Sequence, residues 1–253
     1  MKVNCRTHFK RHEEKMRNWV KNQTNKNEKK QLKPSKNLEE FFGVHNKDAI
    51  KLLKLLPDNS IDLTLTDIPY EKVNKKSNWI RILDKWNANV ITFNLNKFLI
   101  EVDRVTKWSG YIFCWKEQVS QIFDYYASKW YTTRLMIREK TNPSPINCQY
   151  TWMSWIETFV YFKKPWAVFN EFYKNSVLRF PNWTSKNHPT EKSLKLFEKL
   201  VKVSSNKWDI VCDPCVWSWT TAVAAKKLNR KFIVGDINPD YCDLSLKRIN
   251  NAF

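Results

Sequence analysis

Strand and helix patterns alternate from about residue 41 to the end of the chain, and this alternation most constrains the fold. The first strand pattern is an apolar alternation at Ile61, Leu63 and Leu65, which predicts a strand with one buried face. Alternating strands and helices are typical of α/β proteins with a doubly wound, mostly parallel sheet. We expect helices over 49–56, 93–106, 117–128, 191–203, 220–228 and 240–249, and strands over 61–65, 111–114, 134–137, 158–162, 209–212 and 231–234.

The net charge is the next constraint. The chain has 44 Lys and Arg against 25 Asp and Glu, a formal charge of +19. Such an excess favours nucleic acid or another polyanion as partner, although a merely lysine-rich surface would give the same total. The sequence contains neither an apolar run long enough to span a membrane nor a signal-peptide pattern. We therefore expect a cytoplasmic protein with no membrane partner.

Two segments fall outside the alternation of strands and helices. Residues 1–40 hold 12 Lys and Arg against 5 Asp and Glu. They predict a basic, flexible N-terminal arm that either contacts DNA or forms a solvated tail. Residues 141–187 are rich in proline and loop-forming residues, so we expect a loop-rich insertion within one domain that spans residues 41–253.

The cysteines and histidines give no metal motif. The six cysteines are scattered among apolar residues and are typical of buried thiols in a reducing compartment. Cys5, His8 and His12 have a spacing that could bind a metal, but no second pair of ligands follows them. We expect no metal site.

Candidate catalytic residues follow the strand that begins at Ile61. Asp67, Ile68, Pro69 and Tyr70 place a carboxylate, a stiffened turn and an aromatic ring just past its end. Open α/β sheets bind their ligands at such strand ends. A carboxylate accepts hydrogen bonds from an amino group, and an aromatic ring stacks on a base. The alternative for Asp67 is a turn residue that caps the next segment.

A second candidate site lies near the end of the chain. A strand ends at Asp213, a turn and the helix from Thr220 follow, and the next strand ends at Asp236, about twenty residues further on. This order is typical of nucleotide pockets, in which the second acid accepts hydrogen bonds from ribose hydroxyls. The alternative for Asp236 is a helix cap before Pro239.

These motifs resemble those of the amino-group DNA methyltransferases that use S-adenosylmethionine, the adenine-N6 and cytosine-N4 enzymes. Asp67-Ile68-Pro69-Tyr70 matches the catalytic tetrapeptide, and the catalytic motif precedes the cofactor motif, as in the beta group. The resemblance covers roughly residues 43–249 and implies a Rossmann-like methyltransferase fold. The cofactor residues that it implies are Asp48, His188, Pro189, Thr190, Lys192, Asp213, Pro214, Cys215, Trp217, Ser218, Trp219, Thr220, Thr221 and Asp236.

The resemblance also implies a mechanism. The target base is flipped out of double-stranded DNA and stacks on Tyr70. Asp67 and the carbonyl of Ile68 or Pro69 accept hydrogen bonds from its amino group, and the methyl group is transferred directly. A tetrapeptide that begins with aspartate favours adenine, whereas cytosine-N4 enzymes more often begin with serine. Residues 141–187 are the expected target-recognition region, and a homodimer is plausible for the beta group.

Alternatives to adenine methylation stay open, both other methyltransferase activities and a protein without catalytic activity. Cytosine-N4 methylation is the first alternative. A second is a DNA-binding relative without catalytic activity. Methylation of RNA or of protein glutamine is a weaker option, because related tetrapeptides there usually begin with asparagine and because the order of motifs differs.

The chain departs from the family in its glycine and tryptophan counts. It has 3 glycines and 13 tryptophans, whereas an average glycine usage of about 7% predicts roughly eighteen glycines. The family loop has glycine at the positions of Trp217 and Trp219, where the backbone approaches the methionine part of the cofactor. Other tryptophans that stand where family or turn chemistry favours glycine are Trp79, Trp108, Trp115, Trp130, Trp155, Trp166 and Trp208.

One hypothesis explains all these positions: the gene comes from a bacterial lineage that reads the codon UGA as glycine. The protein made in the cell would then carry glycine where the sequence shows tryptophan, and it would be an intact enzyme. If the tryptophans are genuine, the cofactor loop is blocked and the chain is a catalytically inactive relative that still binds DNA. Trp152 is expected to be genuine, because the family tolerates an aromatic residue there.

Overall fold

The computed structural model describes residues 37–69, 93–142, 152–153, 155–172, 174–181, 192–216 and 219–251. The expected arm therefore lies almost entirely outside the described residues, whereas the expected insertion over 141–187 is described in part and contains strands over 156–163 and 177–180. Within the described part of the chain, no helix is both long and apolar enough to cross a membrane.

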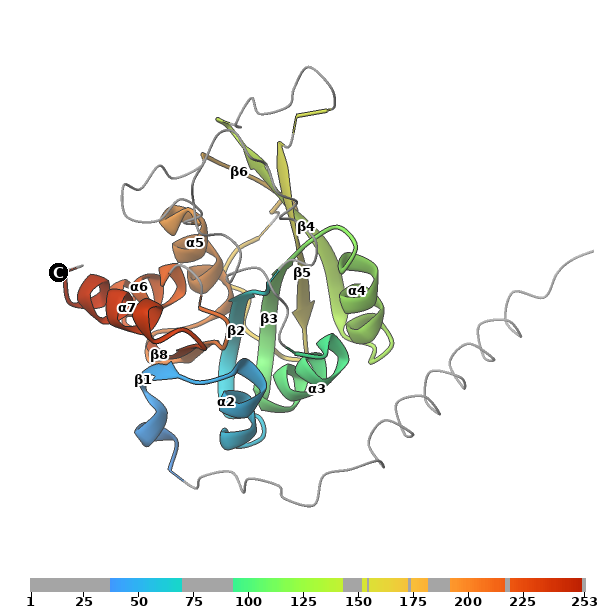
Figure 1. Ribbon diagram of the computed structural model, residues 1–253. Coiled ribbons are helices and arrows are strands. Elements are labelled where there is room, and N and C mark those ends of the chain that lie inside the picture. The colour runs from blue at the N-terminus through green and yellow to red at the C-terminus, as the bar shows by residue number, and fades with distance from the viewer. Residues whose placement is uncertain are drawn as a thin grey trace, which may run out of the picture. The chain divides into compact units, whose positions relative to one another are not determined.

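The described residues form an eight-stranded sheet with the strand order β1-β8-β7-β2-β3-β5-β4-β6 (Figure 1). Neighbours are parallel except for the two pairs that β5 makes with β3 and β4. The expected doubly wound, mostly parallel sheet is thus confirmed. The strands are β1 Gly43–Asn46, β2 Ile61–Asp67, β3 Thr106–Cys114, β4 Thr132–Lys140, β5 Ile156–Lys163, β6 Val177–Phe180, β7 Ile210–Asp213 and β8 Lys231–Asp236.

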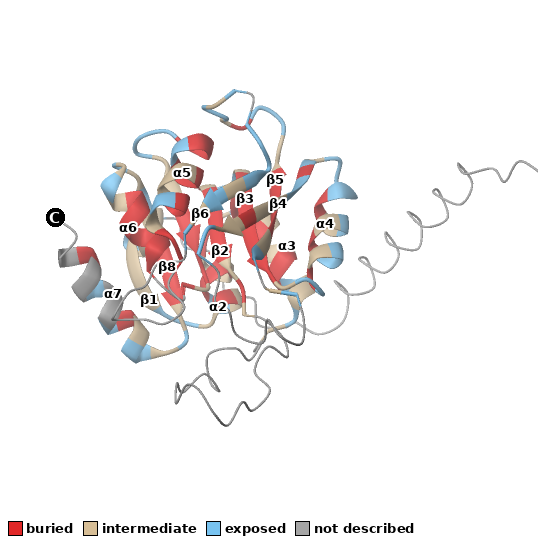
Figure 2. Ribbon diagram, turned by 90° about the horizontal axis from the view of Figure 1, so that it is seen from above, coloured by how far each residue is buried: buried red, intermediate tan, exposed pale blue. Residues whose placement is uncertain are grey.

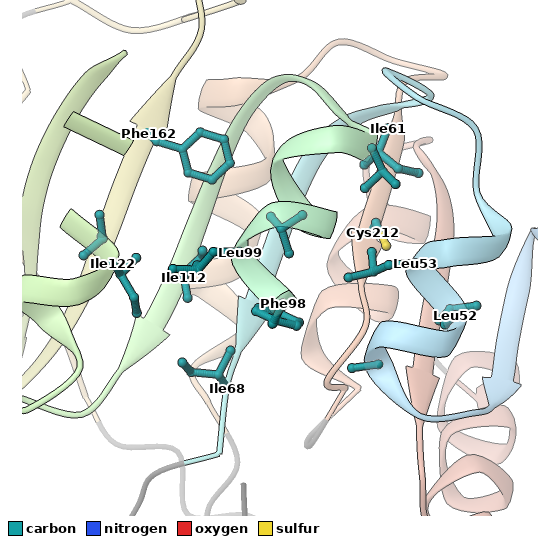
Figure 3. Close-up of a cluster of buried hydrophobic side chains, with 14 of the residues drawn as sticks. Leu52, Leu53, Ile61, Ile68, Phe98, Leu99, Ile112, Ile122, Phe162 and Cys212 are labelled. Carbon is teal, nitrogen blue, oxygen red and sulfur yellow. The ribbon is translucent and has the colours of Figure 1, made fainter. Parts of the chain in front are cut away.

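Helices cover both faces of this sheet, as Figures 1 and 2 show. One face packs against α2 and α3, whose Leu52, Leu53, Phe98 and Leu99 are fully buried in a shared cluster (Figure 3). The other face packs against α5 and α6. The helices are the 3-10 helix η1 Leu38–Phe41 and the α-helices α2 Ala49–Leu55, α3 Leu95–Val105, α4 Val119–Ala127, α5 Leu194–Ser204, α6 Thr220–Lys227 and α7 Pro239–Asn251.

The expectation that β2 has a single buried face is wrong. Leu63 and Leu65 pack on the α5 side, whereas Ile61 packs on the α2 side. Thr64 and Thr66 are also fully buried. The reason is that β2 is a central strand between two layers of helices, so both of its faces are covered.

Six described residues other than glycine have a left-handed backbone: Asn59, Trp130, Trp166, Trp208, Trp219 and Asn229, with φ between 52° and 72°. Asparagine tolerates this conformation, but for a bulky residue it is a genuine outlier. All four tryptophans are among the positions where the sequence predicts glycine. The backbone therefore supports the glycine hypothesis independently of the family resemblance.

Two of these tryptophans occupy positions where local geometry calls for glycine. Pro165 and Trp166 are the central residues of a turn in which the amide of Ala167 donates to the carbonyl of Lys164, 3.3 Å away. With φ of 65° at its third residue, this turn has the type II geometry that requires glycine there. Trp130 follows the end of α4, where helices are commonly closed by a left-handed glycine.

Other tryptophans do not show this signature. Trp115 and Trp155 are not among the residues with positive φ. Trp108 lies within β3, and not at the end of a helix as its preceding lysine suggested, because α3 already ends at Val105. It falls where the register of β3 against β2 shifts between Thr106 and Ser109. A bulge of this kind is a frequent glycine position.

Candidate active site

Four neighbouring parallel strands end in an ionisable residue, an aspartate or a cysteine. β8, β7, β2 and β3 end at Asp236, Asp213, Asp67 and Cys114, and they adjoin one another in that order. From β2 the chain continues to β3 on one side, whereas from β7 it continues to β8 on the other. The boundary between β2 and β7 is therefore the switch point at which open α/β sheets bind ligands, and Asp67 and Asp213 lie on either side of it.

Asp213 holds the loop that joins β7 to α6. Its Oδ2 accepts a hydrogen bond of 2.6 Å from the hydroxyl of Thr221, and its Oδ1 accepts one of 3.2 Å from the amide of Cys215. Burial raises the pKa of Asp213 to about 7, against the lowering effect of the Thr221 hydroxyl. The amide of Val216 continues the loop along β8 by donating to the carbonyl of Gly235. Asp213 and Thr221 thus fix the shape of the loop.

Asp236 and Asp48 lie at the same edge of the sheet, Asp236 as the last residue of β8 and Asp48 two residues past the end of β1. Asp236 accepts a 2.7 Å hydrogen bond from the amide of Asn238, and burial raises its pKa to about 6. Asp48 caps α2 by accepting from the amide of Lys51 at 3.0 Å. Both carboxylates make local turn or cap contacts, so their expected contacts with a cofactor stay predictions.

The backbone after Asp67 is held firmly. Ile68 is buried in the core, and its amide donates to the carbonyl of Phe113 at 3.1 Å. The carbonyl of Pro69 accepts from the side chain of Gln118, 3.2 Å away, and Gln118 in turn accepts from the amide of Trp115 at 2.8 Å. Sequence reasoning missed Gln118, because a glutamine at the start of a helix carries no recognisable pattern.

A buried lysine joins Asp67 to a second carboxylate. The ammonium of Lys192 lies 3.3 Å from Asp67 Oδ2 and 3.3 Å from Glu157 Oε2. Glu157 also contacts Arg138 at 2.9 Å and Lys140 at 3.4 Å. Burial would raise the pKa of Glu157, but these three cations lower it to about 2. Glu157 and Arg138 were not predicted from the sequence.

The structure brings together only part of the predicted site. Asp67, Lys192, Asp213, Cys215 and Asp236 lie at one edge of the sheet, and Pro214, Thr220 and Thr221 are buried beside them. Burial raises the pKa of the Cys215 thiol well above its usual value, so Cys215 is a poor nucleophile. The predicted roles of Tyr70, His188, Pro189, Thr190, Trp217 and Ser218 fall on residues outside the described part of the chain.

The family model described as DNA methylase matches residues 61–247. The chain belongs to this family. The match spans both the strand end at Asp67 and the cofactor loop, and of the predicted site residues only Asp48 lies outside it. The protein is thus an amino-group DNA methyltransferase of the class that modifies adenine N6 or cytosine N4, and it uses S-adenosylmethionine.

Curated relatives and solved structures agree with this assignment. The chain is 30% identical over 233 residues to the Type II methyltransferase M.HpaI of Haemophilus parainfluenzae, covering 81% of this chain and 73% of that protein. It is 26% identical over 242 residues to the DNA adenine methyltransferase YhdJ of Escherichia coli K12, covering 81% of each. The M1.HpyAVI complex with S-adenosylmethionine has a TM-score of 0.64 at 25% identity and covers 82% of this chain and 98% of that one.

One structural neighbour is a cytosine enzyme. The cytosine-N4-specific PvuII DNA methyltransferase has a TM-score of 0.61 at 15% identity, and the match covers 83% of this chain and 91% of that one. At this identity the likeness establishes the fold alone. The comparisons therefore establish an amino-group DNA methyltransferase and leave the choice of base to chemical argument.

The backbone directly before α6 has a conformation that favours glycine. Position 219 precedes α6 in the left-handed conformation that glycine adopts freely, which lets a backbone approach a ligand closely. The indole of Trp219 is only 2% exposed and packs beside Val216, Val223 and Val234. The loop thus retains a glycine-like backbone that carries a tryptophan side chain.

Proposed function

We propose that this DNA methyltransferase methylates N6 of adenine in double-stranded DNA. The observation that carries the proposal is Asp67, a carboxylate at the switch point of the sheet and the first residue of the catalytic tetrapeptide. The adenine specificity named for YhdJ, one of its relatives, also supports this choice. A serine at position 67 would have favoured cytosine.

The residues of the tetrapeptide act on the amino group of the base. Asp67 and the carbonyl of Ile68 or Pro69 accept hydrogen bonds from the amino group and direct the nitrogen lone pair away from the ring. The bound cofactor supplies an electrophilic methyl group on a sulfonium. Transfer of this methyl group to the nitrogen would release the cofactor as a neutral thioether, and the proton lost from the amino group would pass to solvent. Positioning and electrostatics supply most of the rate enhancement.

We assign recognition of the DNA to Tyr70 and the basic arm, which lie almost entirely outside the described residues, and to residues 141–187, which are described in part. We propose that Tyr70 stacks on the flipped adenine, because an aromatic ring directly after the tetrapeptide suits a base taken out of its stack. We propose that residues 141–187 read the target sequence and that the basic arm binds the DNA backbone.

The active form, we propose, carries glycine at positions 217 and 219. The left-handed backbone at Trp219 supports this, since glycine alone adopts it without strain. The sequence as written predicts weak or no cofactor binding, because two indoles replace two hydrogens in a loop that contacts the ligand.

A direct test compares the chain as written with the variant Trp217→Gly/Trp219→Gly. Equilibrium dialysis with labelled S-adenosylmethionine measures cofactor binding, and mass spectrometry of nucleosides from treated DNA identifies the product. We expect binding and N6-methyladenine with the glycine variant alone. Failure of the variant to bind the cofactor would instead support the alternative function, a DNA-binding relative without catalysis.

The same product analysis tests the second candidate, cytosine-N4 methylation. The fold shared with the cytosine-N4-specific PvuII enzyme is the observation that keeps it open. N4-methylcytosine without N6-methyladenine would reject the adenine assignment and leave the role of Asp67 as acceptor unchanged.

A further inference from the structure

Glu157 lies beside the candidate catalytic residue although it is far from it in the sequence. β5 runs antiparallel to β3, and its Thr158 pairs with Cys114, the last residue of β3. Glu157 therefore stands at the same edge of the sheet as Asp67, whose strand β2 adjoins β3 on its other side. The sheet topology thus places the carboxylates of Asp67 and Glu157 at the same edge, although their strands β2 and β5 run in opposite directions.

Lys192 fills the space between these two carboxylates. Its side chain is only 6% exposed, and its ammonium lies 3.3 Å from an oxygen of each. The ammonium also lies 5.4 Å from the centre of the Phe113 ring, which supports the cation from one side. A lysine buried to this degree needs partners of opposite charge, and Asp67 and Glu157 supply them.

Glu157 is itself fixed by cations from the next strand. Arg138 stands directly opposite Glu157 in the β4–β5 register, and its side chain is 1% exposed. Besides Glu157, the guanidinium contacts the carbonyl of Pro181 at 2.7 Å. Because Arg138 is held by both Glu157 and the carbonyl of Pro181, Glu157 has little freedom to move. The Lys192 ammonium, which contacts Glu157, is restricted in turn.

We propose that Glu157 is a positioning residue for methyl transfer, which acts through Lys192 to hold the Asp67 carboxylate in its acceptor orientation. The ammonium on Oδ2 restricts rotation of the carboxylate and balances a site that also contains Asp213. This inference rests on the proposed function, and it differs from the family resemblance, which implies that Lys192 belongs to the cofactor site.

The test uses the full-length chain with glycine at 217 and 219 as the parent, and adds Glu157→Gln or Lys192→Met. For Glu157→Gln we expect kcat to fall about tenfold to a hundredfold, because a small misplacement of an acceptor is costly. We expect KM for cofactor and DNA to change less than about twofold, as for an interaction that matters mainly in the transition state. Lys192→Arg, which keeps the charge, should retain more of kcat than Lys192→Met.

The pH dependence of kcat separates positioning from a general loss of structure. Removing the Lys192 cation makes Asp67 hold its proton to higher pH, so the acidic limb moves up. Removing the Glu157 anion moves that limb down. Among the described residues, the other titratable groups near Asp67 are Asp213 of β7, Cys114 of β3 and Cys215 of the following loop, and they are the same in both variants.

The matched control is Glu101→Gln, in which another partly buried glutamate loses its pairing with an arginine. Glu101 lies on α3, is 15% exposed and contacts Arg104 at 2.8 Å, away from the catalytic edge. We expect its kcat and pH profile to match those of the parent. The proposal would be overturned if the acidic limbs of the Lys192→Met and Glu157→Gln profiles shifted in the same direction. An unchanged kcat in Glu157→Gln would also overturn it. A raised KM for the cofactor alone in Lys192→Met would return Lys192 to the cofactor site.

Crystal structures of the parent and of Glu157→Gln decide the positioning even if no methyl transfer is measured. In Glu157→Gln we expect the Asp67 carboxylate to rotate while it keeps its contact with the Lys192 ammonium. An Asp67–Lys192 contact that stays at 3.3 Å with an unrotated carboxylate rejects the role of Glu157. Absence of methyl transfer by the parent would reject the proposed function instead, so the two failures are distinct.

Discussion

The tryptophans are the residues that least suit their backbone. Trp130, Trp166 and Trp208 are left-handed and between 69% and 93% exposed. Their indoles therefore bury little apolar surface that could offset the strain of the conformation. For an L-residue with a side chain this strain is of order 1–2 kcal/mol.

Replacement of each of these three tryptophans by glycine should stabilise the fold. We expect a gain of about 1 kcal/mol in the free energy of unfolding for each change, because glycine adopts positive φ without strain. Urea unfolding of the single variants measures it.

Two controls separate the effect of relieving backbone strain from the effect of removing the indole. The alanine variants remove the indole but keep Cβ, and should gain little. Trp152→Gly changes a residue that is 97% exposed and is not among those with positive φ, and should not stabilise. Equal gains for alanine and glycine would show that the backbone conformation is not the cause.

Asp236 predicts a pH dependence of cofactor binding. Burial raises its pKa to about 6. Below that pH the carboxyl group is protonated and accepts weaker hydrogen bonds from ribose hydroxyls. Affinity for S-adenosylmethionine should therefore fall between pH 7.5 and 5, by up to about tenfold per pH unit.

Isothermal titration of the glycine form at several pH values measures this loss. Asp236→Asn should bind weakly and with a flatter pH dependence, although Asp213, with a pKa of about 7, titrates in the same range. If the affinity of the glycine form with Asp236 intact stays constant from pH 7.5 to 5, Asp236 does not contact the ribose.

At the scale of elements, the pairing of β4 with β5 places a buried ion pair beside the active site. Glu157 faces Arg138 across these strands. Its pKa is lowered to about 2, below the ordinary value of 4.5, so the folded state binds the proton less readily than the unfolded state. The stabilisation is complete above about pH 4.5 and is lost as pH falls towards 2.

We therefore expect Glu157→Gln to be less stable than its parent at pH 6 and the difference to shrink between pH 4.5 and 2. Denaturant unfolding across this range measures it, with Glu101→Gln again as the matched variant. A difference that does not depend on pH would mean that Glu157 contributes by packing and not by charge.

The elements were predicted well where their patterns are long. Helix α3 was expected over 93–106 and begins at Leu95, because the Asn94 side chain accepts from the amide of Lys97 at 3.1 Å. β1 and β6 were missed, whereas β7, which is equally short, was predicted because its apolar run Ile210-Val211-Cys212 ends at an acid before a turn.

The site residues that could be predicted are the acids at the ends of predicted strands, Asp67, Asp213 and Asp236. The contact of Lys192 with Glu157 could not be predicted. These residues are 35 positions apart, and they meet because β5 inserts antiparallel between β3 and β4, which no local pattern encodes.

For the whole molecule, charge predicts how DNA is bound. Residues 1–36 contain 12 Lys and Arg and 3 Asp and Glu, about half of the net charge of +19. Deleting these residues should weaken DNA binding at low salt and flatten the dependence of log K on log salt, because fewer counterions are released.

Fluorescence anisotropy with a short duplex measures this effect at several salt concentrations, and kcat at saturating DNA should stay unchanged. An unchanged salt slope would show that the arm is a solvated tail. Size-exclusion chromatography of the full chain would test the homodimer that the family resemblance suggests.

The left-handed tryptophans also bear on where this gene can work. If their codons are UGA, a host that reads UGA as a stop signal would release a truncated peptide at the first of them. A host that reads UGA as tryptophan would make the strained form with the blocked loop. Only cells that share the glycine reading would obtain a working modification enzyme, so the gene could pass between lineages by infection or exchange without protecting the recipient's DNA.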